Sequence, residues 1–283
     1  MKSIAADIIQ TIRRTEDLDL SRLDDSFLLQ MIKRRCELIP ISDISTYPAR
    51  LEQDGAERQL LLLSLNNNFT EFFRNSLTFA HLEHWVLPNL IDRIPQGREL
   101  RIWSAGCSTG QEPYSLAILL ENLCEKRQQP FRYRIFATDI SATALAAAST
   151  GEYAQEAVQN IRLKDLNCFF SYANGCYAVS ERLKNHISFS YYDLVDPLSS
   201  NPKESIFGNF DLILCSNVLL YYNAASQRLI LQKLINSMVD SGYLITGEAE
   251  RSITGRCSAV SAVCPPSSIY RKKTEVRYET KQP

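Results

Sequence analysis

The segment from residue 100 to residue 120, LRIWSAGCSTGQEPYSLAILL, constrains the fold of this chain more than any other. An apolar run that ends at Trp103 enters a turn of small residues, and Pro113 then stands where the first turn of a helix tolerates proline. Gly106 and Gly110 suit a turn in which a Cβ would keep a ligand away from the backbone. A strand, a glycine turn and a helix in this order predict a ligand-binding loop at the mouth of a parallel sheet.

Two interpretations of this turn compete. The residues from Gly106 to Gly110 match the G-x-S-x-G pattern of α/β-hydrolases, in which Ser108 would be the nucleophile. They also match the first nucleotide loop of a doubly wound domain. A hydrolase of this kind needs a histidine downstream, and His186 is the only histidine after Ser108. Because the neighbours of His186 do not resemble a loop at the end of a strand, we favour the nucleotide loop.

Composition limits the class of protein. The 283 residues suffice for one large α/β domain and a smaller one. With 31 basic and 32 acidic residues, the chain has no general attraction to nucleic acid, so we expect no such partner. The eight cysteines form no C-x-x-C pair, which indicates reduced thiols rather than a metal site or a disulfide framework. The chain also lacks the apolar core of a signal peptide and any window of membrane-spanning length. We therefore expect a cytoplasmic protein without membrane insertion.

The first 65 residues are predicted to be helical. Ser26 is expected to cap a helix that reaches Leu38, and a second helix is expected over residues 57–65. The basic residues 33–35 form either a solvated helix face or a docking face for an acidic protein partner, and the sequence leaves both open. The following motif, residues 66–74, interleaves aromatic and polar side chains. It is either a lid over a ligand or a capped helix with a surface arginine.

The remaining segments alternate between strand and helix patterns. A strand over residues 133–139 ends in Asp139, which either accepts hydrogen bonds from ribose hydroxyls or only supplies charge to a helix N-terminus. Glu112 has the same ambiguity. Residues 151–187 interrupt the alternation and contain a hairpin with an Asn174-Gly175 turn. Further strands are predicted near residues 186–195, 210–217 and 243–248. A turn is expected at 240–242 and a terminal hairpin at 260–271.

Several motifs in combination resemble the CheR family, the chemoreceptor glutamate methyltransferases of bacterial chemotaxis. The resemblance rests first on Asn68-Phe-Thr-Glu-Phe-Phe-Arg74 and on the run from Trp103 to Tyr114, and it covers residues 20–271. It continues through residues 136–140, 151–153, 217–221 and 247–250. It implies an α/β fold: a doubly wound, Rossmann-like class I methyltransferase domain, an N-terminal helical domain and a small inserted antiparallel β-subdomain. We expect the helical domain and linker at 1–75, the methyltransferase domain at 76–283, and the insert at about 151–187.

The resemblance also implies roles for individual residues. Arg74 would lie near the reacting methyl group and the substrate carboxylate, and Tyr221 would face the active site. Glu112 would hold the amine of S-adenosylmethionine, and Asp139 would hold its ribose. The other cofactor-binding residues implied are Asn68, Thr70, Gly106, Asp193, Leu194, Asn217 and Val218. Three residues depart from the family pattern: Asp193 replaces Asn, Ser216 replaces Arg and Glu248 replaces His.

The implied reaction is methylation of glutamate side chains on chemoreceptors, with S-adenosylhomocysteine as the product. A γ-carboxylate is already ionised at pH 7, so the reaction needs no general base. We expect a monomer whose partner is the cytoplasmic domain of methyl-accepting chemoreceptors. One alternative is a methyltransferase of the same fold with a non-chemotaxis signalling target. Another is a non-catalytic S-adenosylmethionine-binding adaptor. The short Asn174-Gly175 hairpin predicts weak or no tethering of a receptor C-terminal peptide, which some family members grip by strand addition.

Overall fold

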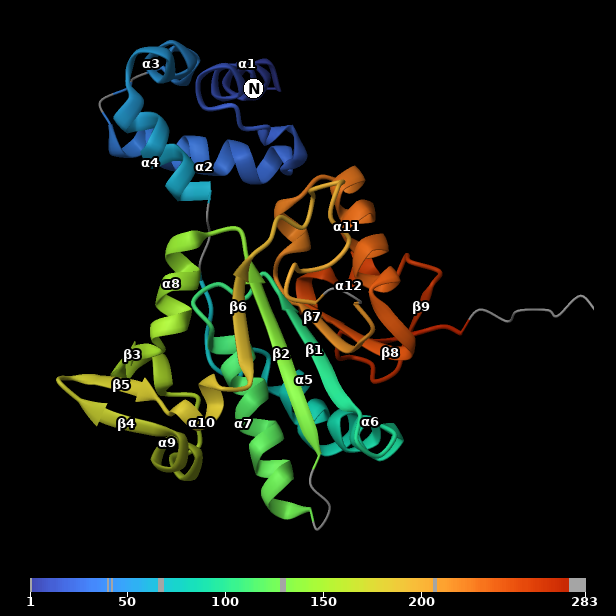
Figure 1. Ribbon diagram of the computed structural model, residues 1–283. Helices are drawn as coiled ribbons and strands as arrows, with labels where there is room; N and C mark the ends of the chain where they lie inside the picture. The colour runs from blue at the N-terminus through green and yellow to red at the C-terminus, as the bar shows by residue number, and fades with distance from the viewer. Residues whose placement is uncertain are drawn as a thin grey trace, which may run out of the picture. The chain divides into compact units, whose positions relative to one another are not determined.

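The computed structural model describes residues 2–39, 41, 43–65, 69–127, 131–205 and 208–274. It divides into two compact units, which we describe separately. The first comprises Met1–Asn68 and Val218–Ile230, and the second comprises Phe69–Asn217 and Leu231–Pro283 (Figure 1).

The first unit is helical, which confirms the prediction for the N-terminal residues. Its main helices are α1 (Lys2–Glu16), α2 (Asp25–Leu38), α3 (Tyr47–Gln53) and α4 (Gly55–Leu65), with 3₁₀ turns η1 (Leu20–Arg22), η2 (Ile44–Thr46) and η5 (Leu219–Tyr221). Ile8, Ile12, Ile32 and Leu51 are fully buried in its core. The predicted cap of α2 is wrong by two residues. The side chain of Asp24 accepts the N–H groups of Ser26 and Phe27, because its carboxylate reaches both from outside the first turn.

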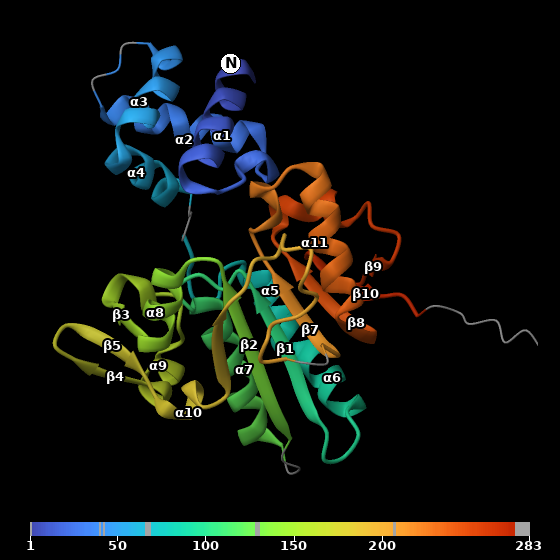
Figure 2. The ribbon, with the colours of Figure 1, turned by 45° about the horizontal axis from the view of Figure 1, so that its top comes forward.

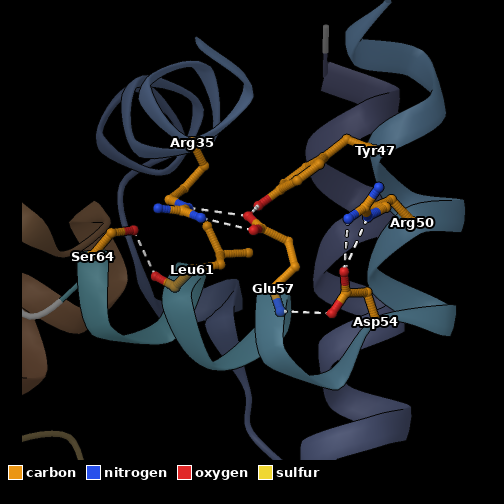
Figure 3. Close-up of polar contacts among 7 residues, drawn as sticks. All are labelled: Arg35, Tyr47, Arg50, Asp54, Glu57, Leu61 and Ser64. Atoms are coloured by element: carbon orange, nitrogen blue, oxygen red, sulfur yellow. Dashed lines mark hydrogen bonds and ion pairs between the residues drawn. The ribbon is translucent and has the colours of Figure 1, made fainter. Parts of the chain in front are cut away.

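Arg35 belongs to the interior of this unit and not to a basic surface. Its guanidinium donates two hydrogen bonds, of 3.0 and 2.7 Å, to the carboxylate of Glu57, and the Tyr47 hydroxyl donates to the same carboxylate at 2.7 Å. Figure 3 shows both donors converging on Glu57 from different helices. The Arg35 side chain is only 13% exposed. Of the three basic residues at 33–35, only Lys33 and Arg34 are exposed to solvent.

The second unit is built on a seven-stranded sheet whose strand order is β6-β2-β1-β7-β8-β10-β9. The first five strands in this order, from β6 to β8, pair in parallel. Strand β10 pairs antiparallel with β8 on one side and with β9 on the other. Figures 1 and 2 show β2, β1 and β7 side by side in its centre. The strands are β1 (Glu99–Ala105), β2 (Arg132–Asp139), β6 (Ile187–Tyr191), β7 (Phe210–Cys215), β8 (Met238–Thr246), β9 (Val260–Ala262) and β10 (Ile269–Lys272). The doubly wound α/β prediction is therefore confirmed.

Both faces of the central strands are buried, as a parallel sheet covered by helices requires. Along β1, Leu100 and Ile102 join one core, whereas Trp103 packs on the rings of Phe210 and Tyr192. The helices of this unit are α5 (Ser76–His81), the π-turn η3 (Leu82–Val86), α6 (Leu87–Arg93), α7 (Gln111–Lys126), α8 (Ala142–Thr150), α9 (Leu163–Phe169), α10 (Glu181–Lys184) and α12 (Arg251–Thr254), with 3₁₀ turns η4 (Gln155–Val158) and η6 (Glu248–Glu250). Helix α11 (Ala224–Asn236) runs through the boundary at Ile230.

A small antiparallel sheet follows α8, in strand order β3-β5-β4, and confirms the predicted β-subdomain. Its strands are β3 (Glu152–Ala154), β4 (Phe170–Ala173) and β5 (Cys176–Val179). Asn174 and Gly175 form the hairpin turn with φ values of +53° and +82°, the left-handed backbone that this turn requires.

The turn at residues 240–242 was predicted to precede the strand that follows, and this strand boundary is wrong. Strand β8 already begins at Met238, and the irregularity stays inside it as a register shift against β7 and a positive φ at Ser241. Within the described residues, no helix is long and apolar enough to cross a lipid bilayer.

Replacing Glu57 by Ala should destabilise the protein by about 3 kcal/mol, because Arg35 and Tyr47 would stay buried without their acceptor. Burial raises the pKa of Glu57, but the hydrogen bonds from Arg35 and Tyr47 outweigh it and hold this pKa below 4.5. The wild type should therefore lose this stabilisation as the pH falls below about 4.5, and the variant should not. Urea unfolding from pH 3 to pH 7 measures the difference.

The matched control is Arg50→Ala. Arg50 pairs with Asp54 at 2.8 Å, but these side chains are 47% and 30% exposed, so the loss should be below about 1 kcal/mol (Figure 3). Equal losses in the two variants would contradict the structural role of Glu57.

Candidate active site

The strand order of the large sheet reverses between β1 and β7. From β1 the chain continues to β2 and β6 on one side, and later to β7 and β8 on the other. Open α/β sheets bind ligands outside the carboxyl ends of their strands at such a reversal. We therefore expect a ligand-binding site at the residues that follow Ala105 and Cys215.

The loop between β1 and α7 has an unusual backbone. Gly106, Ser108 and Gly110 have φ values of +83°, +49° and +94°. At Gly110 a Cβ would lie 3.0 Å from both the Cβ of Ala148 and the hydroxyl of Tyr153. Glycine is thus required at residue 110 both for its conformation and for its close approach to Ala148 of α8 and to Tyr153.

Strand β2 holds this loop in place. The N–H groups of Gly106 and Cys107 donate to the carbonyl oxygen of Thr138 at 2.8 and 2.9 Å. The N–H of Ser108 donates to a carboxylate oxygen of Asp139 at 2.8 Å. The predicted loop and the predicted ribose-binding carboxylate therefore contact each other.

Glu112 lies half-buried in the first turn of α7. Its carboxylate accepts a hydrogen bond of 2.7 Å from the Ser104 hydroxyl, at the end of β1, and another from the Ser216 hydroxyl, just after β7. Burial, with a smaller contribution from the charge of Glu250, raises the pKa of Glu112 to about 7, although the two hydroxyls and the charge of Arg74 oppose the shift. Glu112 is thus a carboxylate at the strand reversal that a cation would readily ionise.

Asp139 is the last residue of β2, and Asp193 lies two residues after the end of β6, which pairs in parallel with β2. The second oxygen of Asp139 accepts the N–H of Ser141 at 2.9 Å, and the Ser141 hydroxyl itself caps α8, so Asp139 is not the capping residue. Asp193 accepts the N–H of Val195 at 2.9 Å, and Leu194 beside it is buried. Each carboxylate is an acceptor of hydrogen bonds at the carboxyl end of its strand.

The segment before α5 is irregular, so the interpretation of residues 66–74 as a capped helix is wrong for the described residues 69–74. Phe72 is fully buried, with ring-edge contacts to Tyr153 and Phe170 at centroid distances of 4.9 and 5.8 Å. Phe73 has a φ of +52°, and its N–H donates to the Ser115 hydroxyl at 3.0 Å. These aromatic anchors prevent the chain from continuing α5 backwards.

Arg74 extends from this anchored segment. Its guanidinium donates to the carbonyl oxygen of Phe69 at 3.0 Å and lies 5.1 Å from the centre of the Phe69 ring. Its positive charge acts on Glu112, which places it in the electrostatic environment of the strand reversal. Thr70 is half-buried in the same segment. Asn68 lies outside the described residues.

Asn217 follows β7 with a left-handed backbone, at a φ of +62°. Its N–H donates to a carboxylate oxygen of Glu250 at 3.0 Å. Its side-chain oxygen is buried and has no hydrogen-bond partner in the part of the chain that the structure describes. An unsatisfied buried acceptor is costly, so it indicates a missing donor.

Val218 and Tyr221 belong to the first unit. There, the carbonyl oxygen of Tyr221 accepts the N–H of Asp24 at 2.9 Å, and its ring packs on Phe27 at a centroid distance of 4.8 Å. Their predicted roles in the site stay predictions.

Two residues of this cluster escaped the sequence analysis. The sequence did not indicate a role for Ser104, because a serine at the end of a strand is common. Glu250 lay in a quoted motif but received no role. Two of the three departures from the family pattern are Ser216 and Glu248. The Ser216 hydroxyl donates a hydrogen bond to Glu112. Glu248 is exposed and lines an open hollow with Ala249, Arg251 and Ser252.

The hydrolase interpretation is wrong. Ser108 lies after the carboxyl end of β1, whereas His186 precedes the first residue of β6, at the opposite edge of the parallel sheet. The ring of His186 stacks on the ring of Tyr133 with a centroid distance of 4.1 Å. His186 therefore cannot act as a base for Ser108. No cluster of three or more metal-ligating side chains occurs among the described residues.

Comparison with known families agrees with this geometry. Residues 68–261 match the family model described as the CheR methyltransferase, SAM binding domain. The chain belongs to the CheR methyltransferase family. It is therefore an S-adenosylmethionine-dependent methyltransferase of the chemotaxis class, as the sequence resemblance predicted.

Relatives of known name cover most of this CheR-family chain. Chemotaxis protein methyltransferase 1 of Pseudomonas aeruginosa is 34% identical over 227 residues, which are 78% of this chain and 80% of the relative. Chemotaxis protein methyltransferase Cher2 of Pseudomonas putida is 31% identical over 258 residues, 89% of this chain and 88% of the relative. The chemotaxis protein methyltransferase of Escherichia coli is 30% identical over 250 residues, 86% of this chain and 82% of the relative.

Replacing Glu112 by Gln should stabilise the cofactor-free enzyme at pH 8 by about 2–3 kcal/mol, because the amide removes the cost of ionising a buried carboxyl. The raised pKa means that the folded protein holds a proton between pH 4.5 and about 7 that the unfolded chain has lost. The advantage of the variant should therefore shrink through this window and vanish below it. Urea unfolding at pH 4, 6 and 8 provides the test, and an advantage that is independent of pH would contradict it.

Proposed function

We propose that this enzyme transfers a methyl group from S-adenosylmethionine to the γ-carboxylate of glutamate residues in methyl-accepting chemoreceptors. The observation that supports the proposal most is the cluster at the strand reversal. It contains Glu112, a carboxylate that favours a cation and that the charge of Arg74 acts on. It also contains Asn217, whose buried side-chain oxygen has no hydrogen-bond partner among the residues that the structure describes.

The residues present fit the cofactor. The ammonium of its methionine part matches the oxygen atoms of Glu112 and Asn217. The carboxylate of Asp139 suits ribose hydroxyls, which donate hydrogen bonds. The carboxylate of Asp193 suits the exocyclic amine of adenine, even though the family pattern has Asn there. Gly106 lets the loop backbone approach the ligand. Thr70, Leu194 and Val218 are assigned as further cofactor-binding residues on the family resemblance alone. Asn68 is assigned on the resemblance alone.

The chain itself has little chemistry to perform. The cofactor supplies a methyl group that its sulfonium already activates. A glutamate carboxylate is ionised at pH 7, so no residue has to remove a proton. The protein has to align the two reactants and to exclude water. Arg74 suits the recognition of the substrate carboxylate, because a guanidinium donates two parallel hydrogen bonds. On the family resemblance alone, we assign Tyr221 as a second residue that faces the substrate.

The proposed partner is the cytoplasmic domain of the receptor, so we place the enzyme in the cytoplasm. We further propose that it is a monomer and that it has no nucleic-acid partner. The expected boundaries, residues 1–75 for the helical domain and linker and 76–283 for the methyltransferase domain with its insert at about 151–187, stay predictions.

The direct test uses tritiated S-adenosylmethionine and membranes that carry the receptors of the source organism. The receptor band should acquire label that alkali releases as methanol, because a methyl ester is base-labile. Absence of label, with cofactor binding confirmed by calorimetry, would contradict the receptor assignment and favour another protein substrate. Absence of cofactor binding would favour the non-catalytic adaptor.

Arg74→Ala should lower methyl transfer at least about 100-fold while leaving much of the cofactor binding, because the residue acts on the reacting carboxylate. Arg74→Lys should recover only a small part of the loss, since an ammonium cannot form the paired bonds. Arg132→Ala, at the opposite end of β2, is the control and should transfer methyl groups normally. Unchanged turnover in Arg74→Ala would refute the assignment.

The hairpin between β4 and β5 has only Asn174 and Gly175 as its turn. A peptide from the receptor C-terminus should therefore bind with a Kd above about 100 μM in calorimetry, since little surface is available for its side chains. The receptor domain should nevertheless be methylated without this peptide. A complex in the low micromolar range would contradict the prediction.

A further inference from the structure

Glu250 is a fully buried carboxylate that no role assigned so far explains. It is 0% exposed, at the end of the 3₁₀ turn η6. One of its oxygens accepts the N–H of Gly247 at 2.6 Å and the N–H of Asn217 at 3.0 Å. The first bond caps the turn that contains Glu250. The second joins it to a loop 33 residues earlier in the chain, which a capping role does not require.

The two bonds tie together the loops that follow β7 and β8. Asn217 adopts its left-handed backbone at this point, and a residue other than glycine is uncommon there. The bond from its N–H to Glu250 holds the backbone from which the Asn217 side chain extends. The oxygen of that side chain is the buried acceptor without a partner among the described residues.

Gly247 completes this arrangement. A Cβ there would lie 2.7 Å from the amide nitrogen of the Asn217 side chain, 2.9 Å from the Asn217 backbone nitrogen and 2.9 Å from the Glu250 carboxylate. The backbone of Gly247 is extended, with a φ of −68° that any residue adopts. Glycine is therefore needed for closeness and not for conformation.

We infer that Glu250 is a positioning residue of the cofactor site, which acts by holding Asn217 so that its side-chain oxygen meets the ammonium of the bound cofactor. The inference rests on the proposed role of Asn217. Its neighbour Ser216 donates to Glu112, so a shift of this loop also moves a hydrogen-bond donor away from the second ammonium acceptor. Glu250 need not touch the cofactor for this purpose.

The test measures the Kd of S-adenosylhomocysteine by calorimetry, with the melting temperature recorded for every variant. Glu250→Ala should weaken binding about tenfold or more, because the loop loses the acceptor of two amides. Glu250→Gln should stay within about threefold of the wild type, since its amide oxygen still accepts both bonds. Gly247→Ala should weaken binding as strongly as Glu250→Ala, because its Cβ displaces the same three groups.

Asp211→Ala is the matched control. Asp211 is also a buried carboxylate on β7, but at the opposite end, where it accepts the N–H of Arg101 at 2.9 Å and a bond from the Arg98 guanidinium at 2.8 Å. Its loss should lower the melting temperature and leave the Kd within about threefold.

Equal effects of Glu250→Ala and Asp211→Ala on the Kd would overturn the inference, because Glu250 would then act on stability alone. If Glu250→Ala does not fold, Gly247→Ala decides: unchanged binding overturns the inference and weakened binding supports it. A wild type that binds no S-adenosylhomocysteine would instead refute the cofactor site itself. A KM for S-adenosylmethionine that rises in Gly247→Ala at constant kcat would further support positioning of the cofactor.

Discussion

The end of β2 controls the shape of the loop on which the whole site depends. Thr138 accepts the N–H groups of Gly106 and Cys107 on its carbonyl oxygen and the indole N–H of Trp103 on its hydroxyl, and Asp139 accepts the N–H of Ser108. Left-handed conformations at non-glycine residues cost about 1 kcal/mol or more each, so such a loop persists only where neighbours hold it. These bonds start α7 at the strand reversal and thereby place Glu112.

Placing acceptors at the strand reversal has an electrostatic cost. Glu112 and Glu250 are close enough for the charge of one to raise the pKa of the other, and the buried oxygen of Asn217 adds a third acceptor. Without a ligand this arrangement is less stable than an apolar one of the same shape would be. A bound ammonium would remove most of the penalty. We therefore interpret the cluster as a site that binds its ligand because the ligand removes an electrostatic cost that the free enzyme carries. Functional sites often lower the stability of a protein in this way.

Local sequence patterns predicted the parts of the structure that local rules determine. The glycine turn after Trp103, the Asn174-Gly175 hairpin and the alternating strands all depend on neighbours in the chain. Contacts across the fold were not predictable in this way. The pairing of Arg35 with Glu57, 22 residues away, and the reach of Glu250 to Asn217 depend on how helices and strands pack, which no short motif encodes. The family resemblance named most candidate residues of the site, and the structure added the hydroxyls and the carboxylate that hold them.

A crystal structure of the enzyme with S-adenosylhomocysteine would test the central claim most directly. We predict that the ammonium nitrogen lies within hydrogen-bond distance of the Glu112 carboxylate and of the Asn217 side-chain oxygen. The ribose hydroxyls should meet Asp139. A product molecule whose ammonium faces solvent, with the Asn217 oxygen still unpartnered, would contradict the assignment of the strand reversal as the cofactor site.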